Sequence, residues 1–221
     1  MATNPQKRQK QLVKKKAKRK VVVTTKKMID KLGGLLSQTA LEKTPIHECQ
    51  AANSLFETGI GTVVLSREIQ NGDLAVGFFM LDVWCLGVKS AFFARLTETE
   101  YQEKLQEIAS RENLQPVSPA YARKLVEDCA AYAKNLGFSP DPDYKKAKRV
   151  FGDIDPNECS ETFEFGKDGQ PFYFSGPYET PEKMRKIVNT LTKTCGADNF
   201  HYVAHQEPFE NEEEDKLEFK A

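Results

Sequence analysis

No two cysteines of this chain form a CxxC pair, although five cysteines are present. An odd number of widely spaced cysteines does not complete a disulfide framework, and it lacks the paired thiolates of a structural zinc site. His201 and His205 fall in a segment predicted to be a strand, where positions four apart are about 13 Å from each other. We therefore expect free thiols in a reducing compartment, no metal site and no cofactor.

Long apolar runs are also lacking. The longest one, Leu74 to Val88, is interrupted by Asp82 and is shorter than the roughly 20 residues of a membrane-spanning helix. The N-terminus has no apolar segment typical of a secretory signal, and its Lys-rich composition differs from that of an Arg- and Ser-rich transit peptide. No membrane partner is expected, and the predicted location is the cytoplasm.

Acidic residues are absent from the first 27 positions, which hold eleven basic ones. The remainder keeps 21 basic and 32 acidic residues, so a cationic arm is joined to a body of net charge −11. A dense positive field attracts polyanions, chiefly nucleic acid, through the release of counterions. The candidate nucleic-acid-binding residues are Lys7, Arg8, Lys10, Lys14, Lys15, Lys16, Lys18, Arg19, Lys20, Lys26 and Lys27.

Part of this arm also resembles an address signal. The run from Lys14 to Lys20 resembles a monopartite nuclear localisation signal, which implies a nuclear location if the source is eukaryotic. Composition divides the chain into a basic, disordered or conditionally helical arm (1–27), a single α+β globular domain (28–206) and an acidic tail (207–221).

Cap and turn signals along the domain predict the element order α-ββ-ααα-ββ-α-β. Thr44 and Pro45 are a typical N-cap and first helical residue, and they predict a helix that ends near Glu57. Asn71-Gly72 predicts the turn of a hairpin, because both residues tolerate positive φ. The other predicted elements are that hairpin's strands (62–66 and 74–84), helices (97–111, 118–137, 141–152 and 180–195), a second hairpin (161–165 with 171–174) and a last strand (199–204).

Two hairpins with helices between them are typical of the α+β class. We expect an antiparallel or mixed sheet built from the two hairpins plus the C-terminal strand, and covered by about five helices.

The most unusual segment outside the arm closes an apolar strand with Asp82, Cys85 and Lys89. One interpretation is a cysteine-dependent enzyme, in which Lys89 lowers the pKa of the Cys85 thiol and His47 acts as the base. The other is structural, because cysteine is often a small buried hydrophobe and Asp82 can pair with Lys89. No known cysteine-enzyme signature surrounds Cys85.

Three functions remain open, and the first is preferred. It is a non-enzymatic nucleic-acid-binding protein that is associated with RNA or the ribosome, in which the body provides positioning or partner contact. RNA is preferred over DNA because a Lys-rich arm suits irregular phosphate surfaces and no groove-reading motif is present. Phe172, Tyr173 and Phe174, near Lys167, are candidates for stacking on bases unless they face the core. The alternatives are the cysteine enzyme and a protein-interaction domain whose anionic body docks a basic partner.

Overall fold

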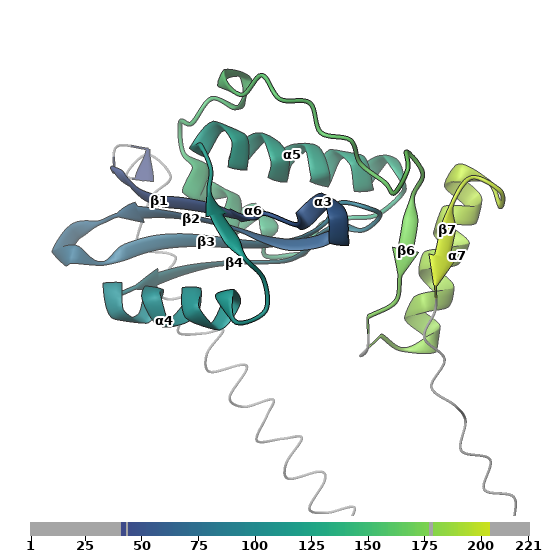
Figure 1. Cartoon of the computed structure of the whole chain (residues 1–221), viewed down its shortest axis with the longest axis horizontal. Coiled ribbons are helices and arrows are strands. Elements are labelled where there is room, and N and C mark those ends of the chain that lie inside the picture. The colour runs from purple at the N-terminus through teal and green to yellow at the C-terminus, as the bar shows by residue number, and fades with distance from the viewer. Residues whose placement is uncertain (1–40, 43, 177–178, 204–221) are drawn as a thin grey trace, which may run out of the picture.

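The main body of the protein is a five-stranded antiparallel sheet with helices on both faces (Figure 1). The computed structural model describes residues 41–42, 44–176 and 179–203. The arm and the acidic tail lie outside this range. The strand order is β4-β3-β2-β1-β5, and every pair is antiparallel. The strands are β1 (Ile46–Ala52), β2 (Ile60–Glu68), β3 (Leu74–Asp82), β4 (Gly87–Leu96) and β5 (Leu114–Pro116).

The hairpin of β2 and β3 is confirmed. Its strands pair from Ile60 with Asp82 to Glu68 with Leu74, and the connection contains a short 3-10 helix, η1 (Gln70–Gly72). Asn71 and Gly72 have φ values of 69° and 75°, in the left-handed region that these two residue types tolerate.

Three helices begin where their caps predict, whereas the helix predicted from residue 141 begins only at Tyr144. Thr97 and Glu100 form a capping box at α4 (Glu98–Ala109), and Ser118 accepts the Tyr121 N–H (3.1 Å) at the start of α5 (Pro119–Asn135). Thr180 caps α7 (Pro181–Cys195) in the same way. The shorter helices are α3 (Leu55–Thr58), α6 (Tyr144–Ala147) and the 3-10 helices η2 (Lys148–Phe151) and η3 (Pro156–Glu158).

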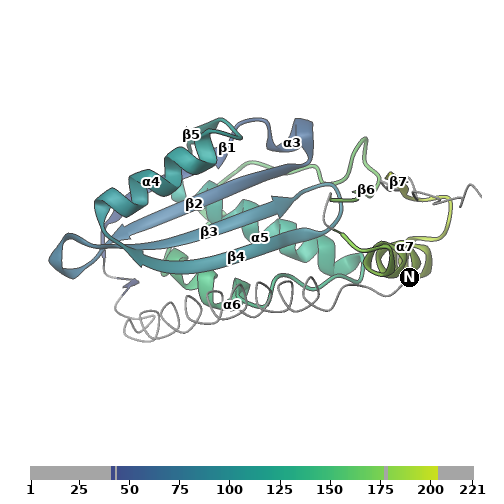
Figure 2. The same cartoon turned by 90° about the horizontal axis from the view of Figure 1, so that it is seen from below.

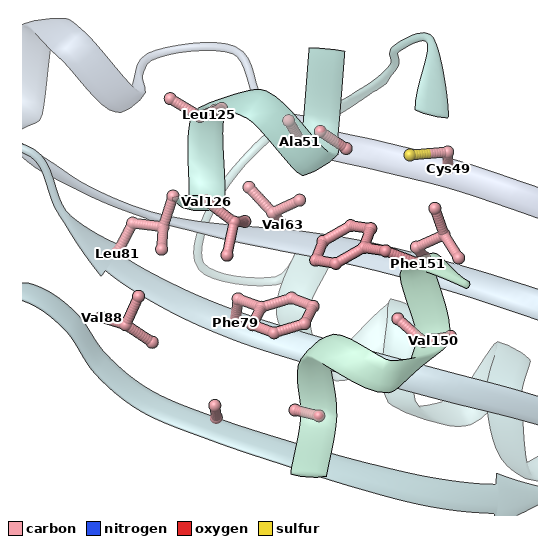
Figure 3. Close-up of a cluster of buried hydrophobic side chains, with 14 of the residues drawn as sticks. Cys49, Ala51, Val63, Phe79, Leu81, Val88, Leu125, Val126, Val150 and Phe151 are labelled. Carbon is pink, nitrogen blue, oxygen red and sulfur yellow. The ribbon is translucent and has the colours of Figure 1, made fainter. Parts of the chain in front are cut away.

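The main core lies between the sheet and α5. Val63, Phe79 and Leu81 point from the strands towards Leu125 of α5, and each is fully buried (Figure 3). Phe151 stacks on Phe79, with ring centroids 5.2 Å apart. Helix α4 covers part of the opposite face, as the two views of the sheet show (Figures 1 and 2). Burial of aromatic and branched side chains on both faces stabilises this three-layer arrangement.

A single buried cation fastens the segments beside this core. Arg67 donates to the backbone carbonyls of Val150 (2.7 Å), Phe151 (2.9 Å), Thr44 (2.7 Å) and Leu41 (3.2 Å). Its side chain is 3 % exposed. Burial lowers its pKa, and nearby Asp153 opposes that shift. The guanidinium therefore joins β2 to η2 and to the chain before β1.

A second, smaller cluster lies beyond the end of the sheet. Strands β6 (Phe172–Phe174) and β7 (His201–Val203) pair in parallel, and α7 lies beside them (Figure 1). Tyr173, Leu191 and Phe200 form their buried contact with Cys85 from the β3–β4 turn.

The fold class is confirmed, but two of the predicted elements are wrong. The segment after Pro45 is strand β1 rather than a helix, because the Thr44 hydroxyl donates to the Leu41 carbonyl (2.8 Å) and closes the preceding turn. The predicted second hairpin does not form, since residues 161–165 belong to no strand and β6 pairs with β7. The turn in between is real, because Lys167 and Gln170 form an isolated bridge.

The alternation at 161–165 has a different physical cause. Phe163 packs edge-on against Tyr121, and Phe165 stacks on Tyr132, so the two rings lie along α5. Extended chain on a helix gives the same period of two as a strand, without a hydrogen-bonded partner. Strand β4 was not predicted. Among the described residues, no helix is both long enough and apolar enough to span a bilayer.

Candidate functional site

Three of the four catalytic candidates lie in or beside the turn between β3 and β4: Asp82 ends β3, Cys85 is in the turn and Lys89 is in β4. The Asp82 carboxylate accepts the backbone N–H groups of Cys85 (2.9 Å) and Trp84 (3.2 Å), so it holds the turn closed. Burial raises the pKa of Asp82 to about 6, while Lys89 and these N–H groups oppose the rise. An acid placed in this way has a direct structural role.

Cys85 lies in a buried environment that does not favour the thiolate. It is fully buried in the cluster with Tyr173 and Leu191. Burial raises its pKa, and the nearby Asp82 raises it further, against a smaller opposite effect of Lys89. A reactive cysteine needs the thiolate and access to solvent, and Cys85 has neither.

Lys89 is directed to a different partner. Its Nζ lies 3.9 Å from Glu179, which also accepts hydrogen bonds from the Tyr173 hydroxyl and from Lys183 (3.0 Å). Burial raises the pKa of Glu179, but the two hydrogen bonds and Lys89 outweigh that effect and hold it below its ordinary value. The group ties β4 to the segment before α7.

His47 is remote from the other three candidates. It lies on β1 near Glu68 (3.8 Å) and Glu98 (3.5 Å), at the end of the sheet where Ile46 pairs with Arg67. Asp82 pairs with Ile60 at the opposite end of the same strand, β2. Seven residue steps of strand separate the two ends by about 23 Å. Asp82, Cys85 and Lys89 lie near one turn, but His47, the predicted base, is not close to them.

The order of cysteine alkylation tests this description. Treatment of the native chain with iodoacetamide at neutral pH is expected to modify the partly exposed Cys159 and Cys195 first and to leave the buried Cys49, Cys85 and Cys129. Peptide mapping by mass spectrometry at several times gives the order. Modification of Cys85 ahead of Cys159 in the folded protein would restore the cysteine-enzyme hypothesis.

The structure also contains a pocket that the sequence did not indicate. Its volume is about 570 Å³. Aromatic side chains from four segments line it, namely Phe56 of α3, Trp84 of the β3–β4 turn, Tyr121 of α5 and Phe163 of the following loop. Phe56 and Phe163 stack with centroids 5.9 Å apart. We call this site the aromatic pocket.

Acidic side chains surround the aromatic pocket. They are Glu57, Glu161, Glu164 and Asp168, and none of these carboxylates forms a side-chain hydrogen bond or ion pair with the residues that the structure describes. Burial raises the pKa of the Tyr121 hydroxyl, and the nearby Glu161 raises it further. The rim therefore presents four carboxylates with which no described cation forms an ion pair, although Lys167 is in the same lining.

One cation already lies on the aromatic faces. The Lys167 ammonium is 5.0 Å from the Trp84 ring centroid and 4.9 Å from that of Phe172. Such distances are typical of cation–π contacts. Of the aromatics predicted to stack on bases, Phe172 is in this contact, Tyr173 is fully buried and Phe174 is 42 % exposed.

No family model, no curated protein and no solved structure matches this chain. Within the part of the chain that the structure describes, no group of three or more His, Cys, Asp or Glu side chains is placed to hold a metal ion. The eleven candidate nucleic-acid-binding residues, Lys7 to Lys27, lie outside the described residues. Three features bear on function: the charge of the arm, the burial of the β3–β4 turn, and the chemistry of the aromatic pocket.

Proposed function

We propose that this chain is a non-enzymatic nucleic-acid-binding protein, associated with RNA or the ribosome, whose basic arm contacts phosphates. The separation of charge is the observation that carries the proposal. The arm has eleven basic residues and no acid, whereas residues 44–203 contain 23 acidic and 17 basic ones. Residues 44–203, the folded part of the body, therefore have a net charge of −6. Phosphate is attracted to the arm and repelled, on average, by the body.

The state of the catalytic candidates supports a non-enzymatic role. Cys85 is buried with a raised pKa, and His47 is at the other end of the sheet. Nucleophilic catalysis needs a thiolate and a base within hydrogen-bond reach of each other. RNA is favoured over DNA because no groove-reading motif accompanies the arm.

Purification with and without nuclease tests the proposal. The full chain, isolated at low salt from cells, is expected to carry RNA, which shows as excess absorbance near 260 nm. Ribonuclease treatment should remove the excess, and deoxyribonuclease treatment should leave it. A preparation whose spectrum is that of pure protein before any treatment, or one that only deoxyribonuclease changes, would contradict the RNA assignment.

A further inference from the structure

We propose that the aromatic pocket binds a Lys- or Arg-rich segment of a partner protein, with a basic side chain placed against Trp84, Phe56 and Phe163. This site goes beyond the RNA-binding arm, and it involves none of the arm's residues. The proposal rests on the walls of the pocket, the charge of its rim, its size and the way its loop is fixed.

The walls are aromatic, and Phe163 already attracts a cation of the chain itself, since the Lys124 Nζ lies 5.7 Å from its ring centroid. The Trp84 Nε1–H donates to the Phe56 carbonyl (3.2 Å), which fixes the indole in orientation. Lys167 already makes a cation–π contact with that ring. Aromatic faces attract ammonium and guanidinium groups, and Trp attracts them most strongly. The chemistry of the pocket is therefore matched to an organic cation.

The charge of the rim selects the same ligand and disfavours nucleic acid. Glu57, Glu161, Glu164 and Asp168 have no described ion-pair partner, and Lys167 is the only cation in the lining. Their summed field raises the local concentration of cations. A phosphate backbone that placed its bases on the same rings would meet four carboxylates. We therefore favour a basic peptide over single-stranded RNA at this site.

The size and the rigidity of the pocket suit a side chain with its neighbouring residues. A volume of about 570 Å³ falls in the range of ordinary ligand sites. Lys124 donates to the carbonyls of Cys159 (3.3 Å) and Glu161, and the Gly166 N–H donates to Val83 (2.9 Å). These bonds fasten the loop to α5 and to the β3–β4 turn, so binding needs little additional ordering.

Trp84 provides the measurement, because it is the only tryptophan of the chain. A lysine-rich peptide without aromatic residues is titrated into the full chain while Trp84 fluorescence is recorded. A glutamate-rich peptide and a single-stranded RNA serve as comparison ligands. The expected result is a saturable change with the lysine-rich peptide, which weakens as salt is added, and no saturable change with the other two.

Two matched double variants distinguish attraction by the rim carboxylates from attraction by the overall negative charge of the body. Glu161→Gln together with Glu164→Gln is expected to weaken peptide binding about tenfold. Glu103→Gln together with Glu182→Gln removes the same charge from exposed positions on α4 and α7 and should leave binding unchanged. If both double variants bind the peptide equally weakly, the peptide is attracted to the whole negative body, and the proposed site is overturned. A response to RNA but not to the peptide would also overturn it.

A full-length variant with the eleven arm residues changed to Gln provides the last control. Peptide binding to both chains supports the proposal, whatever the variant does to RNA binding. Failure of the RNA assignment and failure of the pocket therefore give different results. If the peptide binds only the variant, the basic arm of the unmodified chain already occupies the pocket. That result would overturn the choice of a partner protein.

Discussion

Replacement of all eleven basic residues of the arm by glutamine is expected to lower the affinity of the full chain for single-stranded RNA about 10³-fold or more at 0.1 M salt. Each phosphate contact on a single strand releases about 0.7 counterion. If about six of the eleven side chains reach phosphates, this release contributes a factor of about 10⁴ at 0.1 M salt. The body has a net negative charge, so it does not supply other phosphate contacts in place of those of the arm. Fluorescence anisotropy of a labelled oligonucleotide measures the loss.

Helix α7 provides a control for this variant on the folded body. Its Arg185, Lys186 and Lys193 are exposed, and Glu182 is the one acid of this helix. Their replacement by glutamine should change RNA affinity only a few-fold. A large loss from α7 and none from the arm would place the RNA on the folded body and contradict the proposed function.

Arg67→Met is expected to lower the free energy of unfolding by about 4 kcal/mol. The side chain is buried and is the hydrogen-bond donor to four backbone carbonyls. Methionine fills much of the space but donates nothing, so the carbonyls of Val150 and Thr44 lose this donor. Those of Leu41 and Phe151 keep the hydrogen bonds from Thr44 and Ile154. Each buried polar group left in this way costs about 1–3 kcal/mol, and partial relaxation offsets some of the total.

Arg111→Met is the control for this second variant. Arg111 is 75 % exposed and lies 3.6 Å from Glu107, so its loss should stay within about 0.5 kcal/mol. Urea denaturation followed by far-ultraviolet circular dichroism gives both values. If Arg67→Met does not fold at all, Arg67→Lys keeps the charge and should show an intermediate loss. Equal stability of the Arg67 and Arg111 variants would show that the buried guanidinium does not hold these segments together.

Turn and cap residues in the sequence predicted those turns and helix starts that depend only on neighbouring residues. Asn71-Gly72 made the hairpin turn, and Ser118 and Thr180 capped α5 and α7 as expected. The same kind of signal failed at Thr44-Pro45, because the Thr44 hydroxyl bonds to Leu41 and the following segment pairs with β2. A cap motif is a local preference, and strand pairing over a distance of some 20 residues outweighed it.

The aromatic pocket could not be predicted for a related reason. Its walls come from α3, the β3–β4 turn, α5 and the loop around Phe163, and no pattern within one segment shows that these meet. The only local sign was Lys167 close to an aromatic run, which we interpreted as a base-stacking surface. In the structure Lys167 does lie over Phe172. Glu161, Glu164 and Asp168 are close to it in the sequence, but Trp84, Phe56 and Glu57, which complete the pocket, come from elsewhere in the chain.

The slope of RNA affinity against salt is the most direct test of the central claim, that the arm is the phosphate-binding element. A plot of log K against log salt concentration for the full chain is expected to have a slope of about −4, from about six phosphate contacts. The arm variant, with its eleven residues changed to glutamine, should have a slope close to zero. Equal slopes for the two chains would contradict the account.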